Sequence, residues 1–206
     1  THVSVLPNGV DETRFPFCDP AGREPQTLVF VGNMGYPPNE EAALWFAAAV
    51  WPRLRARYPA LTWEIVGANP GPRVRALATG HNGITVQGRV ADVTHYLGRA
   101  TVAVCPMRSG SGIQTKVLEA LSTGTPVVTT ALANRGIQAQ PDRDLCVADT
   151  PAAFAAAVGQ LLDDPPARVR LGAAGHAFVE RHFQWQGHVQ RLVGFYTQLQ
   201  ERAPAP

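Results

Sequence analysis

The stretch CPMRSGSGIQTKVLEALSTGTPVVTT, residues Cys105–Thr130, decides the fold of this chain. It starts at the end of an apolar run and passes through a turn that holds two glycines. Helical spacing follows over Gln114–Ser122, and Gly124 closes that helix. A fully apolar run, Pro126–Thr130, comes next and predicts a strand. A strand, a glycine-rich turn, a helix and another strand in this order indicate a parallel sheet that is buried on both faces.

The same alternation extends over most of the chain. The predicted strands are Thr27–Val31, Leu61–Val66, Ile84–Gln87, Thr101–Cys105, Pro126–Thr130 and Leu145–Val147. The predicted helices are Glu40–Tyr58 with Asn39 as N-cap, Pro72–Ala78, Val93–Arg99, Gln114–Ser122, Ala152–Leu162 with Thr150 as N-cap, Pro166–Arg181 and Trp185–Arg202. These elements predict an α/β fold: a Rossmann-like doubly wound parallel sheet with helices on both faces and additional C-terminal helices.

Composition excludes several classes of protein. Of the 206 residues, 45% are hydrophobic and 17% are charged, which suits one globular domain. The net charge of +2 gives no indication of a nucleic-acid interface. Three widely spaced cysteines argue against a disulfide framework and against a zinc site. No apolar run approaches the roughly 18 residues of a membrane span and no signal peptide is visible, so a reducing cytoplasm fits best.

The turn before Gln114–Ser122 predicts an anion site. Backbone N–H groups at the start of a helix bind phosphate oxygens without help from a side chain. The donors expected here are Gly110, Ser111, Gly112 and Ile113. Lys116, the only lysine among 18 basic residues, lies within reach of a bound diphosphate, and Glu119 is placed to accept hydrogen bonds from ribose hydroxyls. The turn matches neither GxxxxGK[ST] nor GxGxxG, which argues against a Walker loop and a dinucleotide site. No metal site is expected.

Three predicted strands end in a glycine, namely Gly32, Gly67 and Gly88. Ligands of doubly wound sheets bind at the carboxyl ends of the strands, beside the point where the strand order reverses. Each glycine alone is equally well explained as a tight turn. Because all three follow strands, we expect them to form the floor of one shared crevice.

These residues carry a resemblance to a known family. The run LEALSTGTPVV, which contains Glu119, is similar to the second half of the signature of the family 4 (group 1) retaining glycosyltransferases, which have the GT-B fold of two Rossmann-like domains. The opening run VLPNGVDETRF resembles the linker that enters the C-terminal domain of that family. The first strands of that domain are resembled, in order, by FVGNM, WEIVGANP and ITVQGRVADVTHYL, and the terminal helices, including HFQW, resemble its ending. The resemblance implies an interdomain linker over residues 1–20, a nucleotide-sugar-binding domain over 21–183, and a C-terminal helix and tail over 184–206.

The resemblance also implies a function. The whole enzyme would transfer a sugar from a nucleoside diphosphate sugar to a glycan or lipid-linked acceptor, with retention of anomeric configuration, in cell-surface or exopolysaccharide synthesis. Lys116 and Arg108 would stabilise the departing diphosphate. Gly32 and Asn33 would lie beside it, and Arg89 and Val90 would flank the base. No cofactor is expected other than the donor.

The partners implied are the nucleotide-sugar donor, the acceptor and a missing N-terminal domain, without which the fragment should be inactive. That domain would also supply any peripheral association with the inner face of the membrane.

The sequence departs from the family pattern at two places. Ser111 stands where the family has the first glutamate of its signature, which contacts the sugar. Asn33 stands where an arginine is usual, and Pro37–Asn39 carries no cation, so Arg108 and Lys116 are the expected replacements. Two alternatives therefore stay open: one half of a nucleotide-sugar epimerase with the same fold, and a non-catalytic nucleotide-sugar-binding module.

Overall fold

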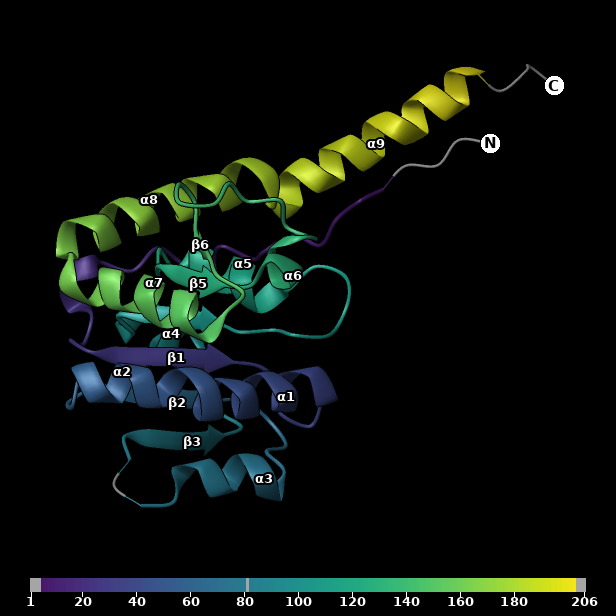
Figure 1. Ribbon diagram of the computed structural model, residues 1–206. Helices are drawn as coiled ribbons and strands as arrows, with labels where there is room; N and C mark the ends of the chain where they lie inside the picture. The colour runs from purple at the N-terminus through teal and green to yellow at the C-terminus, as the bar shows by residue number, and fades with distance from the viewer. Residues whose placement is uncertain (1–4, 81, 203–206) are drawn as a thin grey trace.

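A computed structural model describes residues 5–80 and 82–202 and contains one parallel sheet between layers of helices (Figure 1). Its strands are β1 (Thr27–Val31), β2 (Thr62–Val66), β3 (Ile84–Gly88), β4 (Val102–Cys105), β5 (Val127–Thr129) and β6 (Cys146–Val147). Their order in the sheet is β3-β2-β1-β4-β5-β6, so the order reverses between β1 and β4. This topology confirms the predicted doubly wound Rossmann-like fold.

The helices cover both faces of the sheet. They are α1 (Pro37–Trp45), η2 (Phe46–Val50), α2 (Trp51–Arg57), α3 (Pro72–Arg75), α4 (Thr94–Arg99), α5 (Thr115–Ser122), α6 (Ala131–Asn134), α7 (Pro151–Asp163), α8 (Pro165–His182) and α9 (Trp185–Arg202), with short 3-10 turns η1 (Pro20–Gly22) and η3 (Ala76–Ala78). Figure 1 shows α1, α2 and α7 on the near side of the sheet and α4 behind it. Helix α5 packs against α8.

The central strands are buried because helices lie on both sides of them. In β1 the residues Leu28, Val29 and Phe30 are fully buried, and Phe30 pairs with Ile65 of β2. An aromatic cluster fills the core on the α7 side, where the ring of Phe46 lies 4.6 Å from that of Trp63 and 5.7 Å from that of Phe154. This core holds the carboxyl ends of the strands in fixed positions relative to one another.

The first helix does not begin where the sequence predicted. Its N-cap is Tyr36, and Pro37 occupies the first helical position, so the prediction of Asn39 as N-cap is wrong. Proline has no N–H and its φ is already helical, which favours an earlier start. Asn39 therefore lies inside the first turn, where it is only 4% exposed. Its side chain contacts the backbone of Asn33 and the ammonium of Lys116.

Two other helix starts involve threonine. The hydroxyl of Thr150 accepts a hydrogen bond of 3.2 Å from the amide of Ala153, with Pro151 first in the helix, as predicted. The hydroxyl of Thr130 accepts one from Ala133 and so begins α6, a single turn that the sequence analysis did not foresee. Four residues are too few to show helical periodicity, which explains the omission.

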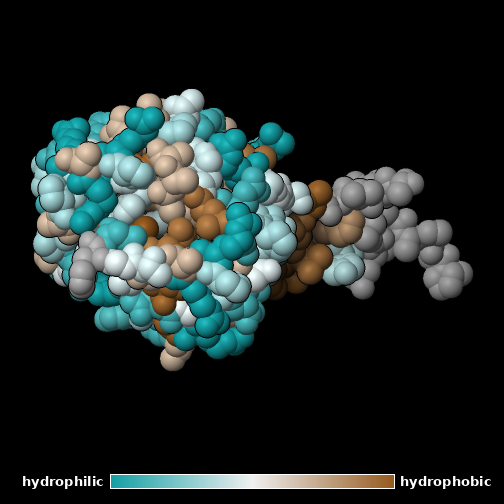
Figure 2. All heavy atoms as spheres, turned by 60° about the horizontal axis from the view of Figure 1, so that its bottom comes forward, coloured by the Kyte–Doolittle hydropathy of each residue, from teal (hydrophilic) through white to brown (hydrophobic). Residues whose placement is uncertain are grey.

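The last helix extends beyond the sheet, and the first described residues run beside it (Figure 1). The amide of Val10 donates to the carbonyl of Phe183, 2.7 Å away, where the two segments meet. Helix α9 exposes Trp185, Val189, Val193 and Tyr196. Figure 2 shows hydrophobic residues gathered where this projection leaves the body of the protein. Among residues 5–80 and 82–202, no helix is both long and apolar enough to cross a membrane.

Candidate functional site

A pocket of about 480 Å³ opens at the carboxyl ends of β1 and β2, next to the reversal of strand order. It is lined by Arg14, Phe15, Val31, Gly32, Asn33, Asn39, Gly67, Ala68, Asn69, Arg89, Val90, Val93, Thr115, Lys116 and Glu119. Doubly wound sheets bind their ligands at this place. The pocket is called the switch-point pocket below.

The floor of the switch-point pocket depends on a close approach between two backbones. The amide of Gly32 donates to Val66 and that of Met34 to Ala68, with distances of 2.9 and 2.8 Å. Gly67 lies between these bonds with φ at +145°, and a Cβ atom on it would overlap the carbonyl oxygen of Gly32. Only glycine fits there. Gly88 lines a neighbouring pocket instead, while Gly32 and Gly67 share this one.

Lys116 carries its charge into the pocket without an acidic partner. Its ammonium donates to the Oδ1 atom of Asn39 at 2.7 Å and to the Oε1 atom of Gln114 at 3.1 Å. It also lies 3.6 Å from the sulfur of Met107 and 5.8 Å from the centre of the Phe30 ring. In the part of the chain that the structure describes, no carboxylate forms an ion pair with it. Burial lowers the pKa of Lys116, and the charge of Glu119 opposes that shift.

Glu119 follows Lys116 by one helical turn on α5 and lines the same pocket. Burial raises the pKa of its carboxyl, and the charges of Arg14 and Lys116 counteract this. No hydrogen bond reaches this carboxylate from any residue within 5–80 or 82–202. A half-buried carboxylate without hydrogen bonds is suited to accept them from the hydroxyl groups of a ligand.

The start of α5 offers further donors. Its N-cap residue, Gln114, makes no side-chain capping bond. Along the described backbone, the amides from Gly110 to Lys116 donate to no other protein group, and the first amide of this region that does is that of Val117. Both Gly110 and Gly112 have positive φ, at +107° and +77°. A run of unsatisfied amides at a helix N-terminus is the arrangement that binds phosphate or carboxylate oxygens.

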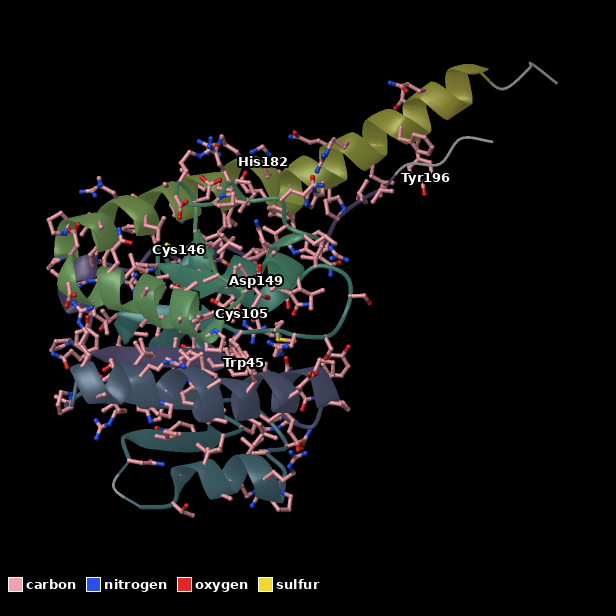
Figure 3. All side chains as sticks on the ribbon, viewed as in Figure 1. Trp45, Cys105, Cys146, Asp149, His182 and Tyr196 are labelled. Carbon is pink, nitrogen blue, oxygen red and sulfur yellow. The ribbon has the colours of Figure 1, made fainter. Side chains whose placement is uncertain are left out.

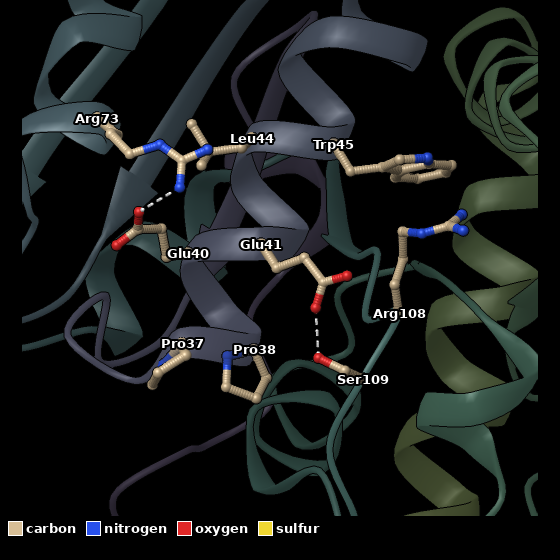
Figure 4. A pocket seen from close by; sticks show the side chains of 9 residues that line it. All are labelled: Pro37, Pro38, Glu40, Glu41, Leu44, Trp45, Arg73, Arg108 and Ser109. Carbon is tan, nitrogen blue, oxygen red and sulfur yellow. Dashed lines mark hydrogen bonds and ion pairs between the residues drawn. The ribbon is translucent and has the colours of Figure 1, made fainter.

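Arg108 lies in a different pocket, of about 700 Å³, on the outer side of α1 (Figure 4). Its guanidinium stacks over the ring of Trp45 with 5.1 Å to the ring centre. Ser109 donates a hydrogen bond to Glu41, and Arg73 pairs with Glu40, in the same pocket. The charge of Arg108 is therefore separated from the switch-point pocket in this structure.

The structure thus brings together part of the predicted site. The predicted residues that line the switch-point pocket are Gly32, Asn33, Arg89, Val90, Lys116 and Glu119. Residues Gly110, Ser111, Gly112 and Ile113 form the loop that leads into α5 and do not line that pocket, and Arg108 lies apart. Neither Arg14 nor the role of Asn39 was predicted from the sequence. Arg14 lies in the segment that was assigned to a linker, and Asn39 was assigned to a helix cap.

Among the described residues, the remaining cysteines and acidic side chains form no second cluster like that of the switch-point pocket. Cys105 and Cys146 lie on different strands, β4 and β6, and both are free thiols (Figure 3). Asp142 and Asp144 have the spacing of a DxD motif, but Asp144 is buried, paired with Arg143 and bonded to the amide of Gln140. Over the described ranges, no group of three or more His, Cys, Asp or Glu residues is placed to hold a metal ion.

A model of the family described as glycosyl transferases group 1 matches residues 25–164. The chain belongs to this family. The matched region contains β1 through β6 and α5, and so includes nearly all of the switch-point pocket.

Two curated relatives match over nearly the whole chain. A glycogen synthase from Mycobacterium tuberculosis is 32% identical over 221 residues, covering 99% of this chain and 51% of that protein. A phosphatidyl-myo-inositol mannosyltransferase from Mycolicibacterium smegmatis is 32% identical over 203 residues, covering 93% of this chain and 50% of that protein. The chain spans about half the length of these relatives.

Solved structures show the same fold. Sucrose-phosphate synthase from Thermosynechococcus elongatus superimposes with a TM-score of 0.77 at 21% identity, over 96% of this chain and 53% of that one. Anabaena Alr3699/HepE, solved in complex with UDP and glucose, gives a TM-score of 0.75 at 14% identity, over 94% of this chain and 56% of that one.

Proposed function

We propose that this chain is the donor-binding domain of a glycosyltransferase and holds a nucleoside diphosphate sugar in the switch-point pocket. The observation that carries the proposal is the half-buried Lys116 ammonium, which has no acidic partner in the described chain and belongs to the helix whose N-terminal amides are unsatisfied. A buried charge is costly unless a counter-ion joins it. A diphosphate provides that counter-ion and uses the amides as well.

The other pocket residues suit the remaining parts of such a donor. We assign the ribose to Glu119, whose carboxylate is available, and the base to Arg89 and Val90, which line the same pocket. Gly32 and Asn33 are proposed to lie along the diphosphate, and Gly110, Ser111, Gly112 and Ile113 to supply amides to the diphosphate or sugar. Lys116 would stabilise the departing diphosphate, with Arg108 in a minor role because it is stacked on Trp45.

The likeness to relatives supports the class of reaction. Glycogen synthase and the mannosyltransferase are both named as sugar-transferring enzymes, and HepE was crystallised with UDP and glucose. We infer transfer from a nucleoside diphosphate sugar to a glycan or lipid-linked acceptor in the cytoplasm, for cell-surface or exopolysaccharide synthesis. Retention of anomeric configuration is part of the proposal because the LEALSTGTPVV run resembles a retaining family.

We further propose that a second Rossmann-like domain binds the acceptor and completes the enzyme, so that this chain alone does not turn over substrate. Residues 1–20 would be the linker to that domain, and 184–206 would return to it. The exposed Trp185, Val189 and Val193 of α9 support this, since monomeric proteins rarely leave such a stripe uncovered. It lies next to the described start of the chain.

The α9 assignment has a direct test in a longer chain that includes the preceding half. Val189→Ser and Val193→Ser together are expected to split one cooperative thermal unfolding transition into two, because the stripe no longer joins the domains. Calorimetry measures the transitions. Gln190→Ser, an exposed polar change on the same helix, is the control. A single unchanged transition in the double variant would disprove the assignment.

The ribose assignment is tested by Glu119→Ala. This variant is expected to bind UDP about tenfold more weakly than the wild type does. Its affinity for inorganic pyrophosphate should be unchanged, because only the nucleoside part of UDP loses a partner. Since the pKa of Glu119 is raised, nucleoside affinity should also fall on acidification at a higher pH than for an ordinary glutamate. Isothermal titration with both ligands measures this, with Glu180→Ala on α8 as control. Equal loss for both ligands would refute a ribose contact.

A further inference from the structure

Asn39 connects the end of β1 to the ammonium on α5. Its side-chain Oδ1 accepts from the Nζ atom of Lys116 at 2.7 Å, and its Nδ2 donates to the backbone carbonyl of Asn33 at 2.9 Å. The residue is 4% exposed, so its amide is largely removed from water and depends on these two bonds. The amide therefore has one fixed orientation, because its acceptor end must face the ammonium and its donor end the carbonyl.

The backbone is shaped around this amide. A Cβ atom on Gly32 would lie 2.9 Å from the Nδ2 atom of Asn39, closer than side-chain carbons come to such an atom. Gly32 therefore leaves the space that the side chain of Asn39 occupies. The carbonyl of Asn33 is in turn fixed by the tight turn after β1, where the amide of Met34 bonds to Ala68. A chain of short contacts thus runs from the sheet to the Lys116 ammonium.

The groups that hold this ammonium are all neutral. Asn39 and Gln114 accept its hydrogen bonds, and Met107 and Phe30 contact it with a sulfur and a ring face. A carboxylate in the position of Asn39 would orient the ammonium equally well but would cancel its charge. A carboxamide orients it and leaves the charge for a ligand.

We propose that Asn39 is a positioning residue that holds Lys116 charged and un-neutralised in the switch-point pocket, and thereby sets the affinity of the site for a diphosphate. This rests on the proposed function. It also explains how the site has a cation although the segment between β1 and α1 carries none. The positive charge comes from Lys116 on α5, and the neutral side chain of Asn39 holds it in place.

Several charged or titratable groups surround the ammonium. Glu119 and Cys105 of β4 act electrostatically on the Lys116 ammonium, and Arg14 acts on Glu119. Arg89 lines the same pocket. Burial raises the pKa of the Cys105 thiol, so that group is neutral near pH 7. Glu119 is the one acid that faces Lys116 from the described elements around the pocket, and it approaches without an ion pair.

The experiment uses the fact that the chain has a single lysine. Lysine labelled with ¹³C at Cε gives one side-chain NMR signal, whose pH titration reports the pKa of Lys116 directly. The same samples are titrated calorimetrically with UDP and with inorganic pyrophosphate, so that the identity of the base does not decide the outcome. Thermal unfolding shows that each variant is folded.

Two variants are expected to shift the pKa of Lys116 in opposite directions. Asn39→Asp should raise the pKa of Lys116 and weaken pyrophosphate and UDP binding about tenfold or more at neutral pH, because the new carboxylate neutralises the ammonium. Asn39→Ala removes an acceptor and should lower the pKa of Lys116, so that binding is lost at a lower pH than in the wild type. Asn69→Asp adds the same charge elsewhere in the pocket and should have a clearly smaller effect on both measurements.

The outcomes separate the two proposals. If the wild type binds both ligands and neither Asn39 variant changes the affinity or its pH profile more than Asn69→Asp does, the role of Asn39 is wrong and the proposed function stands. If the wild type binds neither ligand, the proposed function fails and takes this role with it. An unchanged lysine signal in both Asn39 variants contradicts the positioning contact itself.

Discussion

Replacing Lys116 by methionine is expected to reduce the affinity for a nucleoside diphosphate about 100-fold, equivalent to roughly 2.7 kcal/mol. Methionine keeps the length and apolar character of the stem but removes the only lysine ammonium of the chain. Hydrogen bonds to charged groups contribute more than neutral ones, and Lys116 is partly buried, so its charge is only partly solvated. Isothermal titration with UDP, GDP and ADP measures the loss.

Two matched variants sharpen this prediction. Arg108→Met should change the affinity less than about threefold, because its guanidinium stacks on Trp45 in the outer pocket. Lys116→Arg should also bind more weakly than the wild type although it keeps the positive charge. A planar guanidinium does not fit the acceptors of Asn39 and Gln114, which surround a compact ammonium. Equal losses for Lys116→Met and Arg108→Met would show that the charge of the site has been assigned to the wrong residue.

Gly67→Ala is expected to destabilise the fold by at least about 3 kcal/mol and to abolish nucleotide binding. The new Cβ would overlap the carbonyl oxygen of Gly32, which is backbone and has little freedom to move, and the φ of +145° is unfavourable for alanine. The ends of β1 and β2 must then separate, and the floor of the pocket is lost. Urea unfolding followed by circular dichroism gives the change in free energy.

Two glycines serve as controls for this prediction. Gly22→Ala has open space around its Cβ and should alter stability by less than about 0.5 kcal/mol. Gly88→Ala also has open space but a φ of +69°, so it isolates the cost of backbone strain, about 1 kcal/mol. If Gly67→Ala behaves like Gly88→Ala, the close approach of the two strands is not needed for stability.

Much of the fold was predictable because the apolar runs and the turn residues indicate the same boundaries of strands and helices. Thr27–Val31 coincides with β1, and the long helices α7, α8 and α9 begin and end within one residue of their predicted bounds. The start of α1 was not predictable from capping preference alone. Pro37 favours the first helical position and Asn39 favours an N-cap, and both cannot hold for one helix start. In the structure the side chain of Asn39 contacts Lys116 instead of capping the helix.

The site was predictable in part, for a related reason. Lys116 and Glu119 follow from the start of one helix, since a turn and its first helical residues are close together in sequence. Asn39 contacts Lys116 across 77 positions, and no pattern in a single sequence reports such a contact. The place of Arg108 depends on Trp45, a partner on another element, and so it too becomes visible only in three dimensions.

The most direct measurement is a crystal structure of the chain soaked with a nucleoside diphosphate. We predict that the diphosphate lies between the amides at the start of α5 and the Nζ atom of Lys116, with ribose hydroxyls within hydrogen-bond distance of Glu119. A nucleotide bound elsewhere, or a switch-point pocket that stays closed by the protein's own side chains at saturating ligand, would contradict the account.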